Sequence, residues 1–236
     1  MMKGRTLIHS LALALLLFAI SHAQVGGTAV LQAVRTSSQN FRTQVGEGGA
    51  DVNWTGLGLV SGDMVDMELV NNSNSPKEFK FVPGMILQDP GSQVQPIALE
   101  ESLTFTLQPG ESVKRRMRGY CLDFTKDPPA AGSQEDYEVA EDPGEYMPAV
   151  ESIYRGLELN KNQRFRPVLR PLTHRTIVTQ RAIWAVLGGD NPGTQEELKE
   201  EIEKEIRRGS TIFPSGQIDC LARRIWNDVQ QVMGQK

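Results

Sequence analysis

The stretch "SLTFTLQPGESVKRRMRGYCLDF", residues 102–124, decides the fold. Apolar residues at every second position from Leu103 to Leu107 alternate with threonines, which is the period of a half-buried β-strand. Pro109-Gly110 then predicts a turn, and the residues after it, up to Cys121, form a second strand. The stretch therefore predicts a pair of strands with a turn between them.

The same alternation occurs upstream of this pair. It is found in "MVDMELV", residues 64–70, and in "EFKFVPG", residues 78–84, with the turn-forming "NNSNSP" between them. Several short strands with turn signals between them are typical of an antiparallel β-sandwich or a barrel-like sheet. We assign this unit to residues 63–123. Residues 24–62 are polar and glycine-rich, and their glycines are interpreted as turns.

The chain after Cys121 has a different pattern. An acidic, proline-punctuated loop comes first, and helical periodicity begins after Pro148, so residues 124–236 form a loop and a helical part. The predicted helices are "AVESIYRGLEL", "TIVTQRAIWAVL", "TQEELKEEIEKEIRRG" and "SGQIDCLARRIWNDVQQVM". The expected fold class is therefore α+β, an antiparallel β-sandwich or barrel-like N-terminal half packed with a helical C-terminal half.

The N-terminus has the pattern of a secretory signal peptide over residues 1–23. Lys3 and Arg5 precede an apolar run, and the segment ends in the small-x-small sequence Ser21-His22-Ala23. The apolar run is too short to span a bilayer. We therefore expect a secreted protein, extracellular or periplasmic, with no membrane span after cleavage.

The composition of the chain argues against several kinds of partner and site. Without Lys3 and Arg5 the 25 basic residues fall to 23, against 29 acidic residues, and a net charge of −6 argues against a nucleic-acid partner. His174 is the one histidine after the predicted signal peptide, and no cysteine pair has ligand spacing, so we expect neither a metal nor a cofactor. A hydrolase with a Cys121–His174 pair is disfavoured for the same shortage of histidine.

The basic run "KRRMR", residues 114–118, is expected to face solvent or to pair with the acidic loop 135–145.

The two cysteines differ in position. Cys121 shares strand parity with Met117, which places it on the inward face if no bulge intervenes, and Gly119 is a candidate for such a bulge. Cys220 falls on the polar side of its helix, away from the stripe that contains Ile218 and Ile225. In an oxidising compartment two cysteines favour a disulfide, so a Cys121–Cys220 bridge is one interpretation.

Gln180 stands out on the helix "TIVTQRAIWAVL". At 100° per residue it lies in the middle of an apolar face, between Ile183 and Trp184. A buried primary amide is costly unless its donors and acceptor are satisfied, so this glutamine either has specific partners or has been chemically changed. Spacing alone favours a core glutamine bonded to a nearby loop backbone.

Together, "GYCLDFTKDPPAAGSQEDY" and the later "TQRAIWAVLGGDN" resemble the thioester domain of Gram-positive surface adhesins, over roughly residues 119–191. The shared pattern is an aromatic-Cys-aliphatic motif at a strand end, a proline- and glycine-containing loop with a tyrosine, and a helix with TQxA followed by an aliphatic residue and tryptophan. The resemblance implies that Cys121 supplies the sulfur and Gln180 the acyl group of an internal thioester. It also implies that Tyr120, Thr179, Ala182 and Trp184 complete the motif.

The function implied by this resemblance is covalent adhesion at a cell surface. A buried thioester would pass its acyl group to an amine or hydroxyl on a surface protein or glycan, giving an isopeptide-like crosslink. Such a group is used once, so the chain is not expected to be an enzyme. The alternative is a secreted, non-catalytic binding or structural module of β/α type, stabilised by a Cys121–Cys220 disulfide.

Overall fold

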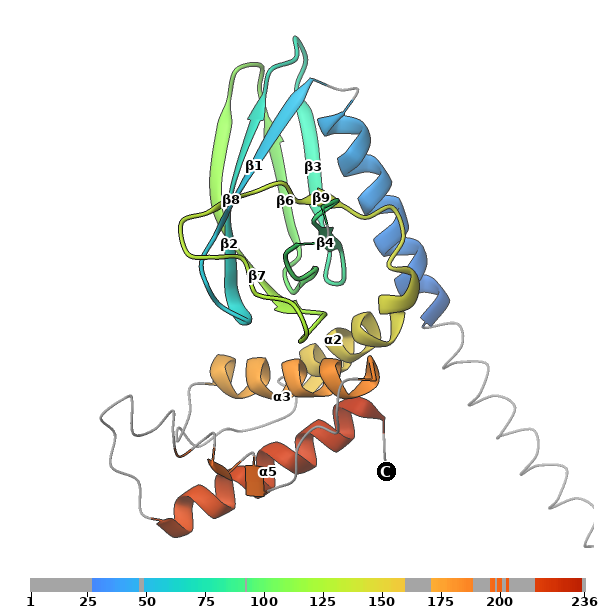
Figure 1. The fold of residues 1–236 in the computed structure, drawn as a ribbon. Coiled ribbons are helices and arrows are strands. Elements are labelled where there is room, and N and C mark those ends of the chain that lie inside the picture. The colour runs from blue at the N-terminus through green and yellow to red at the C-terminus, as the bar shows by residue number, and fades with distance from the viewer. Residues whose placement is uncertain are drawn as a thin grey trace, which may run out of the picture.

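The computed structural model (Figure 1) describes residues 27–46, 49–91, 93–159, 171–188, 196, 197, 199, 200, 203 and 215–234. The predicted signal peptide lies outside these residues. The fold class is α+β: a curled antiparallel sheet forms a barrel-like half, and helices pack at one end of it. This confirms the fold class predicted from the sequence.

The β half contains nine strands in two sheets. The larger sheet has the order β8-β1-β2-β7-β5-β4-β9, and the smaller pairs β3 with β6. The strands are β1 Ala50–Gly56, β2 Ser61–Asn71, β3 Lys77–Phe81, β4 Ile86–Gln88, β5 Ile97–Leu99, β6 Leu103–Leu107, β7 Ser112–Cys121, β8 Gln134–Glu135 and β9 Glu138–Val139.

Alternating burial along the strands follows the sequence pattern. In β2, Val65, Met67 and Leu69 are buried, whereas Asp66 and Glu68 between them are partly exposed. The one register shift between β2 and β7 falls between Asp63 and Val65. The bulge considered at Gly119 is therefore absent from the described β7, and a Cβ at Gly119 would lie 2.6 Å from the Ala98 carbonyl oxygen of neighbouring β5.

A helix over residues 27–45 packs along the β half (Figure 1, blue). Phe41 on this helix contacts the rings of Phe79 and Phe81, with centroids 6.1 and 4.9 Å apart. This differs from the interpretation of residues 24–62 as a polar segment of turns. The periodic signal was weak because two of the buried helix positions are serines, Ser37 and Ser38.

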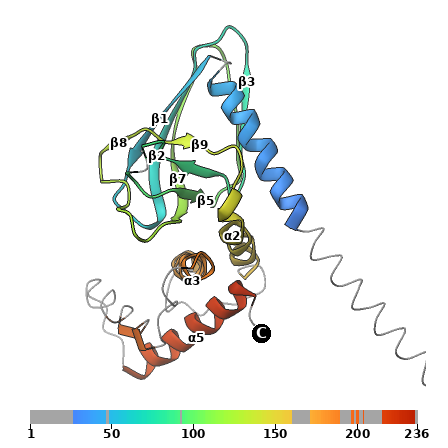
Figure 2. The ribbon, with the colours of Figure 1, turned by 45° about the vertical axis from the view of Figure 1, so that its right-hand side comes forward.

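At one end of the sheet, the described part of the C-terminal half contains the helices α2 Met147–Leu159, α3 Pro171–Val186 and α5 Ser215–Met233, with the short 3₁₀ helix η1 Gly144–Tyr146 before α2. Figure 2 shows α3 between the sheet end and α5, with α2 beside it. Of the predicted helix 194–209, the structure describes residues 196, 197, 199, 200 and 203, and all five are helical.

Two apolar clusters hold the halves together. The larger fills the β half and continues into α2 and Ile183 of α3. The smaller lies between α3 and α5 and includes Val178, Ala182 and Ile225. The helix α3 therefore contributes to both clusters, and its position relative to the sheet sets the geometry of the site. Among the described helices, none has the length and apolar character that a membrane crossing requires.

Candidate functional site

Cys121 is the last residue of β7 and is fully buried. It pairs with Ile97 of β5, and its amide N–H donates to the Val60 carbonyl oxygen at 3.0 Å. The side chain belongs to the larger apolar cluster, together with Met117. Cys121 is thus buried in the core, although Tyr120, of opposite strand parity, is buried in the same cluster.

Gln180 lies in α3 and is only 4% exposed. Its side-chain amide makes two hydrogen bonds to the backbone of one residue: the Cys121 N–H donates to Gln180 Oε1 at 3.1 Å, and Gln180 Nε2 donates to the Cys121 carbonyl oxygen at 2.8 Å. The Cys121 N–H is therefore shared between Val60 and Gln180, a common three-centre arrangement. The amide that looked costly to bury is satisfied by the backbone of Cys121.

Burial raises the pKa of the Cys121 thiol to about 12. An apolar environment disfavours the charged thiolate, so the free thiol is neutral at physiological pH. An uncharged sulfur, whether a thiol or an acylated sulfur, is the form that this environment stabilises.

Cys220 does not reach Cys121. Both cysteines are free, Cys121 buried and Cys220 exposed on α5. The apolar residues of α5, such as Ile225 and Val229, face α3, and Cys220 lies on the opposite, polar side, as the helical wheel indicates. The proposed Cys121–Cys220 disulfide is therefore not formed in this structure.

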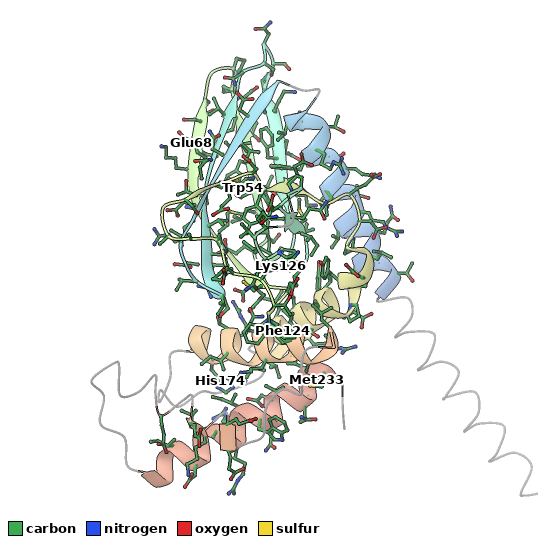
Figure 3. The ribbon with its side chains drawn as sticks, in the orientation of Figure 1. Trp54, Glu68, Phe124, Lys126, His174 and Met233 are labelled. Atoms are coloured by element: carbon green, nitrogen blue, oxygen red, sulfur yellow. The ribbon has the colours of Figure 1, made fainter. Side chains whose placement is uncertain are left out.

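His174 is buried rather than solvated in a loop. It lies near the start of α3, and its Nε2 is 2.7 Å from Asp228 Oδ2 of α5, between the two helices (Figure 3). Six residues separate it from Gln180, a rotation of about 240° around the helix axis, so the two side chains leave different faces. A Cys121–His174 nucleophile pair has no support in these contacts.

The four supporting residues of the motif are adjacent in sequence to Cys121 or lie in α3 with Gln180. Tyr120, Thr179 and Ala182 are buried, and Trp184 is partly buried against the larger cluster. The Tyr120 hydroxyl donates to Glu100 at 2.9 Å. Burial first, and the charge of Glu100 second, raises the pKa of Tyr120, which keeps this hydroxyl protonated.

A group of ion pairs beside the site was not anticipated from the sequence. Arg118 of β7 pairs with Glu100 and Asp63, and Arg175 of α3 pairs with the same Glu100. Arg118 also donates to the Thr176 hydroxyl of α3 at 3.0 Å. These charges come from distant segments, so no local pattern in the sequence marks them as neighbours.

Lys114 and Arg116 of the basic run pair within the sheet. Lys114 contacts Glu68 at 3.1 Å, and Arg116 contacts Asp66 at 3.0 Å, both across the β2–β7 register. Both basic side chains are exposed to solvent, as the first of the two expectations has it, and neither contacts the acidic loop 135–145 in these pairs. Cross-strand geometry decides the pairing because residues opposite each other on two strands have their Cβ atoms about 5 Å apart.

The loop after Cys121 packs against the β half. Tyr137 in this loop is buried, and its hydroxyl donates to the Gln95 carbonyl oxygen at 2.9 Å. Tyr137 also forms part of the wall of a pocket of about 790 Å³ whose lining includes Trp54 and Asp89, but neither Cys121 nor Gln180. The pair is thus enclosed by protein rather than open to this pocket.

Within the described ranges, no group of three or more histidine, cysteine, aspartate or glutamate side chains is arranged to hold a metal ion. Comparison of the chain with protein-family models, curated proteins and solved structures found no match. Function is therefore inferred from the geometry of the site and from the sequence motif.

Proposed function

We propose that this chain is a secreted protein that forms an internal thioester between Cys121 and Gln180 and uses it once, for covalent attachment to a surface partner. The observation that carries the proposal is the pair of hydrogen bonds joining the Gln180 amide to the Cys121 backbone. Two residues 59 positions apart, predicted from a motif to react together, are held in direct contact.

In the proposed reaction the Cys121 sulfur attacks the Gln180 amide carbon. In that step the Cys121 S–H bond and the Gln180 C–N bond break, an S–C bond forms, and the thiol proton leaves on nitrogen as ammonia. Negative charge develops on Gln180 Oε1 as the sulfur adds, and the Cys121 N–H already donates to that atom. The Cys121 carbonyl oxygen accepts from Nε2 and holds the leaving nitrogen in a fixed orientation.

The same surroundings suit a long-lived acyl group. Both residues are buried, and a buried site excludes water, so hydrolysis of the thioester is slow. When an amine of a surface protein or a hydroxyl of a glycan attacks, a C–N or C–O bond forms, the C–S bond breaks, and the acceptor's proton passes to sulfur. The released thiol stays neutral at physiological pH, which opposes its return attack.

The intact mass of the mature protein under non-reducing conditions tests the proposal. We expect a mass lower than that of the sequence by one ammonia, and no such loss in Cys121→Ala or Gln180→Leu. Cys220→Ser is the matched control and should retain the loss. Methylamine should release one free thiol and convert Gln180 to its N-methyl amide. We expect this in the unmodified protein and in Cys220→Ser, and not in Cys121→Ala or Gln180→Leu.

A second candidate is the non-catalytic module. It is favoured by the same observation, since the two hydrogen bonds also satisfy an unreacted core glutamine. Its disulfide has no counterpart in the structure, where both cysteines are free. An intact mass equal to that of the unmodified sequence, with two titratable thiols, would establish this candidate and reject the thioester.

A further inference from the structure

The carboxylate of Glu100 is the point where the strand end and the helix of the site are joined by charge. Its side chain is only 1% exposed, and its oxygens contact Arg118 Nε at 3.1 Å, the Tyr120 hydroxyl at 2.9 Å and Arg175 Nη2 at 2.5 Å. Arg118 and Tyr120 belong to β7, and Arg175 belongs to α3. Glu100 itself follows β5 directly, so one carboxylate connects three elements.

The residues that contact Glu100 are close in sequence to the reacting pair. Tyr120 precedes Cys121, and Arg175 is five residues before Gln180. Arg118 adds a second connection, because its Nη2 donates to Thr176, one helical turn before Gln180 on the same side of α3. The charge within the group is balanced, with Arg118 and Arg175 against Glu100 and Asp63.

Two attachments fix a helix against a strand more completely than one. Arg118 and Cys121 are three residues apart on β7, a distance of about 10 Å along a strand. Thr176 and Gln180 are four residues apart on α3, about 6 Å along a helix. With Arg118 bound to Thr176, both the axial position and the rotation of α3 are set, and Gln180 is the residue that meets Cys121.

We infer that Glu100 is a positioning residue for thioester formation, acting through Arg118, Arg175 and Tyr120 to hold Gln180 against Cys121. The inference rests on the proposed thioester. Glu100 touches neither reacting side chain in the contacts described above, so its effect is on geometry. A misplacement of about 1 Å lowers the rate of such a reaction by up to about a hundredfold.

The test follows thioester formation in time. Full-length mature protein is prepared in denaturant, shown by mass to carry unreacted Gln180, and refolded, and the ammonia loss is recorded at intervals. Folded fraction is measured in parallel by near-ultraviolet circular dichroism, and rates are compared per folded molecule. We expect Glu100→Gln to slow the loss by about tenfold or more.

Two further variants separate positioning from packing. Glu100→Asp keeps the charge but is smaller, whereas Glu100→Gln keeps the volume without the charge. The inference predicts that the Glu100→Asp variant forms the thioester faster than the Glu100→Gln variant. A role in packing alone predicts the reverse order. Thr176→Val removes the hydroxyl that accepts from Arg118 on α3, keeps every charge and should also slow the reaction.

Asp66→Asn is the matched control. It removes an ion pair with Arg116 between β2 and β7, at a position that is partly exposed and does not contact α3 in the described pairs. Its rate should equal that of the unmodified protein. Equal rates in Glu100→Gln and the unmodified protein would overturn the positioning role alone, whereas no ammonia loss in any protein would overturn the thioester itself.

Discussion

At the scale of single residues, the site depends on a side-chain amide whose two ends bind the same backbone. Gln180 uses its oxygen and its nitrogen on Cys121, and this leaves the cysteine sulfur in an apolar environment. Burial raises the pKa of that thiol to about 12, so less than about one molecule in a thousand carries a thiolate at pH 8. Cys220, which is exposed, has no comparable protection.

This difference predicts selective alkylation of the two cysteines when no thioester is present. In Gln180→Leu, iodoacetamide at pH 8 should modify Cys220 and leave Cys121 intact, because only a thiolate reacts. Since the pKa of Cys121 lies near 12, its rate should rise about tenfold for each pH unit between 8 and 11. Peptide mass spectrometry after timed quenching measures both sites.

The control for this experiment is Gln180→Leu combined with Cys220→Ser. In its native state it should take up no label at pH 8, and in denaturant it should take up one. Equal rates at Cys121 and Cys220 in the native protein would contradict the protected thiol.

Some residues of the site could be predicted from the sequence, and others could not. Helical periodicity placed Gln180 on a buried face and Cys220 on a polar one, and both positions agree with the structure. Glu100 was missed because its importance comes from Arg118 and Arg175, which lie in other segments and meet it only after folding. Long-range charge pairing leaves no periodic trace in a sequence.

At the scale of elements, α3 is held by a close contact with α2. A Cβ at Gly156 of α2 would lie 2.2 Å from Thr179 Oγ1, a distance at which the Thr179 side chain or one of the helices must shift. Thr179 directly precedes Gln180, so this contact also controls how near the glutamine comes to β7. The glycine permits the close approach of the helices because it has no side chain.

Gly156→Ala should therefore destabilise the protein by about 1–3 kcal/mol, the usual cost of overpacking, despite alanine's better helix propensity. Guanidinium denaturation measures the change. The double variant Gly156→Ala with Thr179→Ala removes the clashing hydroxyl and should recover most of the loss, although Thr179→Ala alone does not stabilise. Additive effects of the two substitutions would show that they do not meet.

The elements themselves were predicted best where their period was regular. The alternation of apolar and polar residues predicted the strands β2, β3 and β6, and an apolar stripe predicted the helix α5. The helix over residues 27–45 was missed because buried serines and a glycine-rich flank concealed its apolar positions. The partners of the basic run in β7 depend on strand register, which a single segment does not specify.

At the scale of the whole molecule, the site joins the barrel-like half to the helical half. The contacts of α3 reach the sheet through Gln180 and Arg175 and reach α5 through His174 and the smaller apolar cluster. A covalent bond between Cys121 and Gln180 would close a loop of 59 residues across this junction. It would therefore act on stability as well as on reactivity.

The thioester should stabilise the folded protein in the way that a disulfide does, by restricting the unfolded chain. For a loop of this length, the chain-entropy relation gives about 4 kcal/mol at 25 °C, an upper value because the unfolded chain retains some structure. Methylamine opens the loop without changing the sequence, so treated protein should unfold at lower guanidinium concentration, with a decrease of up to about 4 kcal/mol. Refolding followed by intact mass verifies that the untreated protein kept its thioester through the experiment. Cys121→Ala has no loop to open, and methylamine should leave its unfolding midpoint unchanged; an equal shift in this variant would show that the amine acts elsewhere in the protein.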